Sequence, residues 1–510
     1  MSMITLPGLT EKGDWDLPST LNMARQCLSG SPERTAIVDL TGTVQRKVTL
    51  AALHLEVDKI AHALLQHVGR GDRVGVLLSQ SVWCAAAHLA IWKIGAISVP
   101  LFTLFQQDAL ASRLSDAGCA VVLSDAEGCG RLEGLAVAWR VDACGIEGDA
   151  LPFAETGPED PAVLIYTSGT TGKPKGALHG HRVLTGHLPG VALSHDYLGQ
   201  SGDCLWTPAD WAWIGGLFDV VMPGLVLGVP VVATRPEKFS ARGCAEIISR
   251  GNIRNVFLPP TALRMLKAAD AKIFGLRSIA SGGEPLGAEM MAWARDAFGL
   301  AINEFYGQTE CNMVVSSCHA AFTAVPGCMG QPVPGHVLAV LDQDGKPTQA
   351  EGDIAVHRGS PSMMLRYWGQ PEATADKFRG DWLITGDRGS WEGAFLRFVG
   401  REDDVITSSG YRIGPAEIED CLLMHPDVVT CGVVGKPDHL RTEIVKAYVV
   451  RQADSMIGAE ELQRWVKDRL ASYLFPREIA FVNALPMTVT GKVIRQALKL
   501  RAAQECEVDK

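Results

Sequence analysis

The sequence predicts an α/β fold, with a large N-terminal domain of helix-flanked β-sheets and a small, mobile α+β domain at the C-terminus. Short β-branched runs alternate with helix-like segments over the first 300 or so residues. Past Gly327 the runs shorten between Gly, Pro and Asp, which indicates a smaller β-rich subdomain. From about Arg401 a compact unit follows, and 510 residues exceed what one hydrophobic core usually organises.

The alternation of strands and helices runs from about Asp72 to Phe298. Sheets with helices packed on their faces are the usual result of such a pattern. Strands are expected at 74–78, 97–101, 120–123, 163–166, 229–233, 255–258 and 276–280, and helices up to Trp92 and at 241–250, 261–269 and 285–298.

The remainder of the chain divides into the β-rich subdomain and the C-terminal unit. The subdomain has expected strands at 337–341, 352–356 and 395–399. The C-terminal unit has expected helices at 415–423 and 459–470 and strands at 428–434, 444–450 and 479–482. We therefore assign residues 1–402 and 403–510 to the two domains, and expect residues 501–510 to be a frayed polar terminus.

Composition excludes several classes of function. The net charge is -10 and the predicted pI is near 5.7, without clusters of Lys and Arg, which argues against a nucleic-acid partner or an anionic membrane surface. The N-terminus lacks signal-peptide character and no uninterrupted apolar run would span a membrane. Thirteen cysteines without a Cys-x-x-Cys pair indicate reduced thiols. We predict a cytoplasmic protein and leave open whether it is a homodimer.

The most specific local feature is a loop from Tyr166 to Gly176 that directly follows an apolar run. Its glycines let backbone N–H groups approach oxyanions, its hydroxyls add short donors, and its lysines add charge, so it is suited to a polyphosphate. It is not a Walker A loop, because Pro174 follows Lys173 in a different glycine spacing. The predicted ATP-binding residues of the loop are Thr167, Ser168, Gly169, Thr170, Thr171, Gly172, Lys173 and Lys175.

This loop resembles the phosphate-binding signature of the acyl-adenylate-forming superfamily, which includes acyl-CoA synthetases, firefly-luciferase-like enzymes and the adenylation domains of nonribosomal peptide synthetases. Further motifs that resemble the family's core motifs follow in order at 281–285, 304–310, 385–387, 400–404, 409–419 and 486–492. The resemblance covers nearly the whole chain. It implies that ATP activates a carboxylic acid as an acyl adenylate, and that the acyl group then passes to coenzyme A.

The motifs also carry chemistry suited to a nucleotide. Tyr306, beside glycines, suits adenine stacking, Thr309 suits a phosphate, and the carboxylate of Glu310 suits a hard cation, which the resemblance identifies as Mg²⁺. Asp387 and Arg401 suit the ribose hydroxyls and a phosphate. The resemblance also assigns Gly282, Gly283, Glu284, Pro285, Glu304, Phe305, Gly307, Gln308 and Phe398 to the ATP or AMP site.

Lys492 is the predicted catalytic residue, because attack of a carboxylate on the α-phosphate brings two anions together. Its position near the C-terminus requires the small domain to fold over the large one. In the second half-reaction, the resemblance implies rotation about a hinge at Asp403. The segment Ser409 to Arg412 would then replace the lysine, with Arg412 neutralising a phosphate. The predicted CoA-binding residues are Ser409, Gly410, Tyr411, Arg441 and Lys467.

The predicted acyl pocket is lined by Trp213, Ile214, Gly215, Gly282 and Gly307. Acetate-restricted relatives carry a tryptophan at the position of Gly307, so a cavity deeper than acetate requires is expected. Amino-acid-activating relatives carry an aspartate at the position of Gly215, and the nearby Asp219 is out of register with it. We therefore predict a short- to medium-chain fatty, branched or aromatic acid in an uncharged pocket, with preferences closest to those of medium-chain acyl-CoA synthetases.

Two other functions stay open at this point. A stand-alone adenylation enzyme could charge a protein-bound phosphopantetheine, although the absence of a fused carrier domain favours free CoA. A non-catalytic nucleotide-binding homologue is disfavoured because Lys492, Glu310 and Asp387 are all present. The cluster His179, His181 and His187 lacks a carboxylate or cysteine at metal-ligand spacing, and we take it as structural or pocket-lining.

Overall fold

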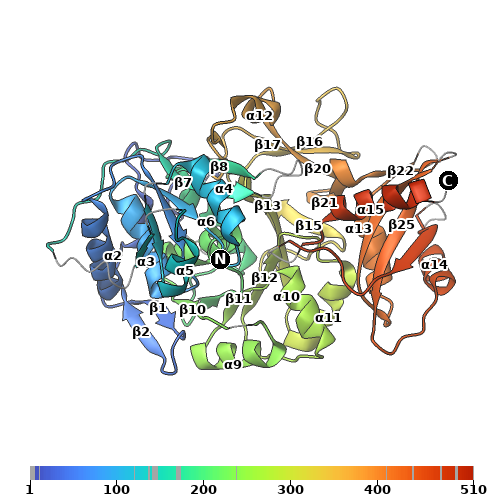
Figure 1. The fold of residues 1–510 in the computed structure, drawn as a ribbon, viewed down its shortest axis with the longest axis horizontal. Helices are drawn as coiled ribbons and strands as arrows, with labels where there is room; N and C mark the ends of the chain where they lie inside the picture. The colour runs from blue at the N-terminus through green and yellow to red at the C-terminus, as the bar shows by residue number, and fades with distance from the viewer. Residues whose placement is uncertain are drawn as a thin grey trace.

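The computed structural model describes residues 6–10, 12–119, 121–135, 138–140, 148–167, 174–236, 238–408, 411–438, 441–470, 474–488 and 492–508. Within these ranges the strands form three sheets, of fourteen, seven and five strands. In Figure 1 the five-stranded sheet and its helices form the orange-to-red lobe at the right, beside a larger body that holds the other two sheets. This division agrees with the α/β body and small C-terminal unit that the sequence predicts.

The seven-stranded sheet belongs to the N-terminal part of the body. Its order is β18 (Arg366–Tyr367), β8 (Lys175–Gly180), β7 (Pro161–Thr167), β4 (Ile97–Pro100), β3 (Arg73–Leu77), β5 (Val121–Ser124) and β6 (Ala138–Arg140). The strands from β7 to β6 are parallel, and helices α2 (Leu50–Leu64), α3 (Val82–Lys93), α4 (Gln107–Ala117) and α5 (Ala126–Arg131) lie between strands in the sequence. Buried β-branched and leucine residues explain why these strands form a covered parallel sheet.

The fourteen-stranded sheet joins a parallel half to an antiparallel half. Its order is β16 (Leu338–Leu341), β17 (Gly352–His357), β20 (Trp382–Glu392), β21 (Phe395–Arg401), β15 (Cys328–Pro332), β14 (Cys311–Ser316), β13 (Ile302–Gln308), β12 (Ser278–Gly282), β11 (Asn255–Phe257), β9 (Leu205–Trp206), β10 (Val231–Ala233), β1 (Thr35–Asp39) and β2 (Arg46–Thr49), with β19 (Phe378–Arg379) beside β20. The expected β-rich subdomain is therefore the antiparallel half of this sheet. The parallel half ends at β13, where the predicted site motifs begin.

Helices cover the parallel half and fill the space between the two large sheets. The helices that alternate with its strands are α9 (Ala241–Gly251), α10 (Pro260–Ala268) and α11 (Ala288–Phe298). Much of the buried core comes from α1 (Met23–Cys27), α6 (Arg182–Ser194), α7 (Ile214–Gly216), the π-helix η2 (Leu217–Val221) and α8 (Met222–Leu227). The short helix α12 (Pro371–Asp376) lies before β19. Helix α6 is buried along nearly its whole length and contacts β8 of one sheet and β12 to β14 of the other. It therefore links the two sheets close to the site.

The apolar stretch 217–233 is divided among η2, α8 and β10. Across the part of the chain that the structure describes, no helix has both the length and the apolar character needed to cross a bilayer.

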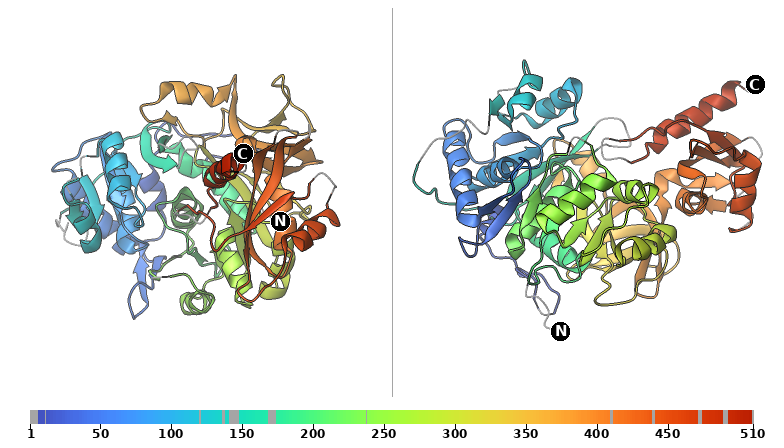
Figure 2. Two further views of the ribbon diagram at one scale, coloured as in Figure 1. Left: turned by 45° about the vertical axis from the view of Figure 1, so that its right-hand side comes forward. Right: turned by 90° about the horizontal axis from the view of Figure 1, so that it is seen from below.

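The C-terminal lobe follows the short 3₁₀ helix η3 (Glu402–Asp404). Its sheet has the order β23 (Tyr411–Ile413), β22 (Ile406–Ser408), β25 (Thr442–Arg451) and β24 (Val428–Asp438), with β26 (Glu478–Phe481) also beside β25. Helices α13 (Pro415–Leu423) and α14 (Ala459–Lys467) pack on it around a small core of their own. The right-hand view of Figure 2 shows this lobe beside the rest of the chain.

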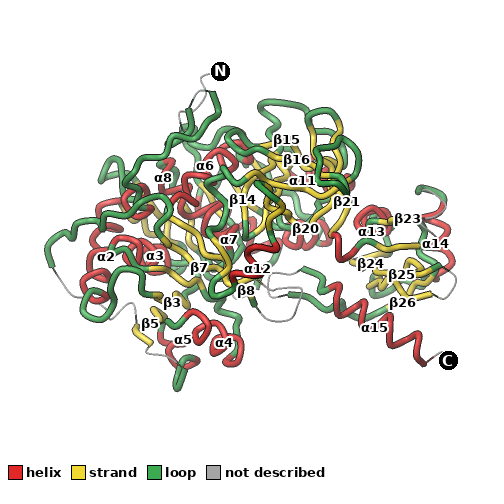
Figure 3. Tube along the Cα trace, turned by 90° about the horizontal axis from the view of Figure 1, so that it is seen from above, coloured by secondary structure: helices red, strands yellow, loops and turns green. Residues whose placement is uncertain are grey.

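The expectation of a frayed C-terminal tail is wrong for residues 501–508. They belong to α15 (Arg495–Val508), which Figure 3 shows at the outer side of the lobe. Leu498 and Ala502 lie on one helical face and are buried against β24 and β25, and Glu505 accepts a hydrogen bond from the ammonium of Lys446. Apolar contacts and an ion pair along the same face therefore hold a helix whose sequence is mostly polar.

Candidate active site

The predicted nucleotide motifs meet at the carboxyl ends of β12 and β13. These strands pair in parallel register, with Gly282 opposite Phe305, so the segments that follow them emerge at the same edge of the sheet. The carboxyl edge of parallel strands is the common ligand site of α/β folds. Here β12 leads into the Gly283–Pro285 loop, and β13 leads into a turn formed by Thr309 and Glu310.

Asp387 is held by two donors from β13. The Tyr306 hydroxyl donates to Oδ2 of Asp387 at 2.7 Å, and Nε2 of Gln308 donates to the same oxygen at 2.8 Å. Oδ1 faces Nη1 of Arg401 at 3.7 Å. Burial raises the pKa of Asp387, and the cation of Arg401 opposes that shift. Because two donors already occupy Oδ2, Oδ1 is the oxygen suited to ribose hydroxyls.

Other predicted residues support this arrangement from behind. Phe398 packs with Tyr306 in one apolar cluster. Oε1 of Glu304 accepts from the backbone N–H of Leu286 at 3.1 Å, and burial raises the pKa of Glu304 to about 8. Glu284 pairs with Nη2 of Arg264 at 2.5 Å. The carboxyl of Glu304 thus helps to hold the loop after β12 in place through the backbone of Leu286.

Glu310 is positioned by a tyrosine that the sequence motifs do not include. The hydroxyl of Tyr367, on β18, donates to Oε1 of Glu310. The Nζ of Lys175 lies 5.4 Å from the centre of the Tyr367 ring, which links Glu310 to the strand that follows the phosphate loop. The pairing of β18 with β8 brings Tyr367 here, and this long-range contact leaves no local sequence signal.

Lys377 is a second residue that lies outside the motifs. Its Nζ donates to the backbone carbonyls of Ile384 at 3.1 Å and Thr385 at 3.2 Å, directly before Asp387. Burial lowers its pKa, although the carboxylates of Glu310 and Asp387 oppose that shift. Lys377 therefore adds positive charge beneath the predicted phosphate and ribose positions.

The site offers one carboxylate for the expected Mg²⁺. In the described ranges, no three His, Cys, Asp or Glu side chains form a group that could hold a metal ion. Mg²⁺ commonly keeps several waters and binds through one or two carboxylates together with substrate phosphates. Glu310, oriented by Tyr367, fits that mode of binding when ATP supplies the remaining ligands.

Lys492 reaches this site from the C-terminal lobe. Its backbone N–H donates to Oγ1 of Thr488 at 3.0 Å, and its Nζ lies 6.0 Å from the centre of the Trp213 ring. Its Cε would lie 3.8 Å from a Cβ placed on Gly283. Burial lowers the pKa of Lys492, and the carboxylate of Glu284 leads the opposing interactions. In Figure 1 the dark red segment before α15 extends from the lobe toward β12.

The three glycines of the predicted acyl pocket do not leave empty space beside them. A Cβ on Gly215 would lie 2.7 Å from the Trp213 ring, and one on Gly282 would lie 2.5 Å from the Phe305 ring. A Cβ on Gly307 would lie 2.3 Å from Oδ1 of Asn312. Asn312 therefore lies where a side chain at position 307 would begin, and the depth of the acyl pocket stays a prediction.

The residues predicted for CoA lie apart from the Lys492 contacts. Asp403 is in η3, between the body and the lobe, and its carbonyl accepts from Lys499. Tyr411 and Arg412 are on β23, at the edge of the small sheet. The backbone N–H of Arg441 donates to Asp438 at 2.8 Å. Lys467 ends α14, and its Nζ lies 5.7 Å from the centre of the Phe475 ring.

Some predicted residues of the phosphate loop and of the CoA segment lie outside the described residues. They are Ser168, Gly169, Thr170, Thr171, Gly172, Lys173, Ser409 and Gly410.

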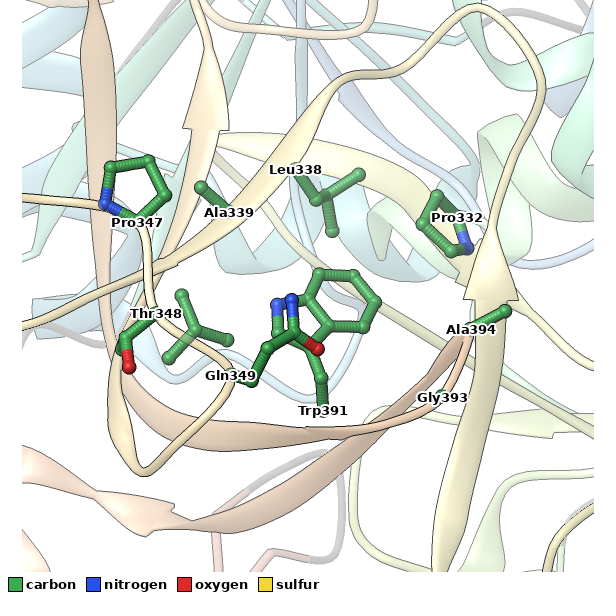
Figure 4. A pocket seen from close by; sticks show the side chains of 10 residues that line it. Pro332, Leu338, Ala339, Pro347, Thr348, Gln349, Trp391, Gly393 and Ala394 are labelled. Atoms are coloured by element: carbon green, nitrogen blue, oxygen red, sulfur yellow. The ribbon is translucent and has the colours of Figure 1, made fainter.

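A surface hollow of about 350 Å³ lies elsewhere, in the antiparallel half of the large sheet (Figure 4). Pro332, Leu338, Pro347 and Trp391 are among its lining residues, and none of the predicted site residues lines it. The candidate active site is therefore defined by the convergence of the motifs rather than by this hollow.

Comparisons with known proteins agree with this geometry. The AMP-binding enzyme family matches residues 24–368, and the AMP-binding enzyme C-terminal domain matches residues 417–492. The chain is 32% identical to the uncharacterized acyl-CoA ligase YtcI of Bacillus subtilis, over 97% of this chain and 99% of that one. It is 31% identical to the acetyl-coenzyme A synthetase of Bacillus subtilis, over 89% and 85% of the two chains.

A solved structure has the same overall arrangement. The anthranilate CoA ligase AuaEII in complex with anthranoyl-AMP superposes with a TM-score of 0.86 at 26% identity, over 96% of this chain and 99% of that one. The similarity therefore extends over both the body and the C-terminal lobe.

Proposed function

The chain belongs to the AMP-binding enzyme family and is an AMP-forming acyl-CoA ligase, and we propose how its residues divide the work of the two half-reactions. The observation that carries the proposal is the position of Lys492, which enters from the C-terminal lobe and lies beside the Gly283 loop. A lysine withdrawn from water at this point has a clear task, because the reaction brings an anionic acid to an anionic phosphate.

In the first half-reaction, a carboxylate oxygen of the acid attacks the α-phosphorus of ATP, and the bond to pyrophosphate breaks. The ammonium of Lys492 stabilises the charge that develops on the α-phosphate and on the bridging oxygen. Asp387 holds the ribose through Oδ1, because Tyr306 and Gln308 occupy Oδ2. Residues 167–175 would hold the outer phosphates, and Glu310 would hold Mg²⁺, which when bound supplies neutralisation of phosphate charge.

In the second half-reaction, the thiol of CoA attacks the acyl carbonyl, and AMP leaves with the bonding electron pair. We propose that the lobe rotates about Asp403, so that Lys492 withdraws and the segment from Ser409 to Arg412 takes its place. The edge position of β23 supports this, because an edge strand can approach a new surface without breaking the sheet. Arg441 and Lys467 would then contact CoA phosphates.

The proposed acid is short- to medium-chain, branched or aromatic. Gly307 cannot carry the side chain that restricts relatives to acetate. Three aromatic rings also form a row, in which the Phe257 centroid lies 5.6 Å from that of Trp213 and 5.2 Å from that of Phe305. Such rings favour an apolar or aromatic acyl body. One methylene discriminates by only about 1 to 3 kcal/mol, so neighbouring acids in a series compete.

The test is a panel of linear, branched and aromatic acids from acetate to dodecanoate, incubated with ATP, Mg²⁺ and CoA. We expect AMP, pyrophosphate and acyl-CoA in equal amounts, measured by mass spectrometry. ADP as the nucleotide product would contradict the mechanism. Replacing CoA by a phosphopantetheinylated carrier protein tests the other thiol acceptor. The cytoplasmic location and a homodimer both stay predictions. Light scattering would measure the oligomeric state.

A further inference from the structure

One carboxyl group of the C-terminal lobe packs against the body beside the active site. Asp420 lies on α13, and a Cβ placed on Gly287 would lie 2.8 Å from its Oδ1 and 3.4 Å from its Oδ2. Gly287 belongs to the same loop between β12 and α11 as Gly283, beside which Lys492 lies. Both contacts are made by the lobe with one loop of the body, so they depend on the same position of the lobe.

Carboxylates surround Asp420 on both sides of this interface. Glu417 and Glu419 share α13 with it, on the side of the lobe. On the side of the body, Glu289 lies in the first turn of α11, and Glu304 lies on β13. A second negative charge among these groups is unfavourable wherever water is excluded.

The cations near this interface are paired with other carboxylates. These pairs are Arg264 with Glu284, Lys267 with Glu289 and Arg495 with Glu419. Within the part of the chain that the structure describes, the carboxyl of Asp420 has no ion pair or hydrogen bond of its own. An ionised carboxylate in this place therefore loses water without gaining a partner.

The protonation of Asp420 changes near neutral pH. Burial raises the pKa of Asp420 to about 7, the surrounding carboxylates add to the shift, and the guanidinium of Arg264 opposes it. Burial also raises the pKa of Glu304 to about 8, so this neighbour stays largely neutral over the same pH range. The thiols of Cys421 and Cys431 likewise have pKa values raised by burial and stay uncharged.

We propose that Asp420 makes the position of the lobe depend on pH, because its neutral carboxyl packs against Gly287 in the adenylation position and its ionised form favours rotation of the lobe. Rotation would carry α13 away from α11 and return the carboxyl to water. The inference rests on the proposed function, since it takes this rotation as the step between the two half-reactions. Asp420 contacts a loop rather than a substrate, and it acts as a positioning residue.

The direction of the effect follows from the proton balance. Away from the body Asp420 has an ordinary carboxyl pKa, so the adenylation position binds a proton that the rotated position releases. The preference for the adenylation position is therefore strongest at low pH. It weakens by about tenfold with each pH unit from about 4 to about 7, where the carboxyl ionises in both positions, and then levels off.

Asp420→Asn tests this effect, because it keeps the size of the side chain and removes its titration. Pyrophosphate release measures adenylation, and acyl-CoA formed from supplied acyl adenylate and CoA measures the second half-reaction. The CoA thiol ionises identically for both proteins, so the ratio of variant to wild-type rates at each pH isolates Asp420. We expect this ratio for thioester formation to fall by at least about tenfold between about pH 5.5 and 7.5 and then to stay constant. The ratio for adenylation should stay within about a few fold at every pH.

A second variant acts on the same carboxyl from the body. Glu289→Gln removes a carboxylate that raises the pKa of Asp420, which should move its titration down by about half a pH unit. Thioester formation should then match the wild type near about pH 5.5 and be about threefold slower at about pH 8. Glu460→Gln is the control, because Glu460 is an exposed carboxylate of the same lobe, on α14, and it should match the wild type at every pH.

The outcomes separate the inference from the proposed function. A ratio of thioester rates in Asp420→Asn that does not change with pH, or an equal loss of both half-reactions, would overturn the inference alone. Failure of the wild type to release pyrophosphate with every acid would contradict the proposed function instead. If Asp420→Asn does not fold, as judged by thermal unfolding, the pH dependence of Glu289→Gln decides in its place.

Discussion

The nucleotide side and the acyl side of the site are built in different ways. On the nucleotide side, polar side chains from separate strands of the large sheet bond to one another, as Tyr306 and Gln308 of β13 do with Asp387 of β20. On the acyl side, glycines leave room that side chains from elsewhere occupy, as Asn312 does beside Gly307. On the nucleotide side, the polar residues that would bind ATP form the site themselves. On the acyl side, the residues that pack beside the glycines determine the shape of the wall.

This difference explains why one side tolerates little change while the other sets selectivity. The charges near ATP must match a substrate that never varies. The acyl wall depends on packing, where a shift of one side chain changes the space for the acid. Substitutions on the nucleotide side should therefore alter rates for all acids together, and substitutions on the acyl side should alter the ratios among acids.

The largest expected effect comes from Lys492→Ala. Loss of a charge placed at the α-phosphate should lower the rate of adenylation by about 10²- to 10³-fold, equally for every acid. Thioester formation from supplied acyl adenylate should be nearly unchanged, because the lobe would have moved the lysine away. Pyrophosphate release measures the first step, and acyl-CoA formation from acyl adenylate and CoA measures the second.

Arg501→Ala is the comparison for this variant, because Arg501 is a cation of the same lobe whose exposed side chain pairs with Glu505 on α15 at 3.3 Å rather than with the ATP motifs or with Asp403. It should retain adenylation within about a few fold, as expected of an exposed contact. Equal loss of both half-reactions in Lys492→Ala would contradict the domain rotation.

On the acyl side, Gly307→Ala should change selectivity and stability together. The added Cβ would lie 2.3 Å from Oδ1 of Asn312, so that side chain must move. Overpacking of this kind costs about 1 to 3 kcal/mol, and the relative kcat/KM of long and short acids should shift by up to about 10-fold. Thermal unfolding and the acid panel measure the two effects.

Gly42→Ala is the control, because an added Cβ there meets nothing within 4 Å, and it should change neither the stability nor the acid profile. An unchanged acid profile in Gly307→Ala would show that this glycine does not border the acid.

The sequence predicts the two sides unequally for a physical reason. Strand and helix periodicity is local, and each nucleotide motif is a short run of consecutive residues, so both can be recognised in the sequence. Tyr367 reaches Glu310 only through the pairing of β18 with β8, and Asn312 meets Asp219 from 93 residues away. Helix α15 is hard to predict because Leu498 and Ala502 form a narrow apolar stripe among charges, although their spacing of four is a usable signal.

The smallest effect is expected for Tyr306→Phe. The ring would keep its place against the apolar cluster that Phe398 also contacts, but Oδ2 of Asp387 would lose one of its two donors. The KM for ATP should rise about 5-fold, which corresponds to about 1 kcal/mol for one hydrogen bond. The ratios among acids should stay constant, since the lost donor faces the ribose position rather than the acyl wall. Steady-state kinetics with ATP varied at saturating acid measures the first quantity, and the acid panel measures the second. A change in acid ratios without a change in the KM for ATP would place Tyr306 on the acyl side and break the division drawn between the two halves of the site.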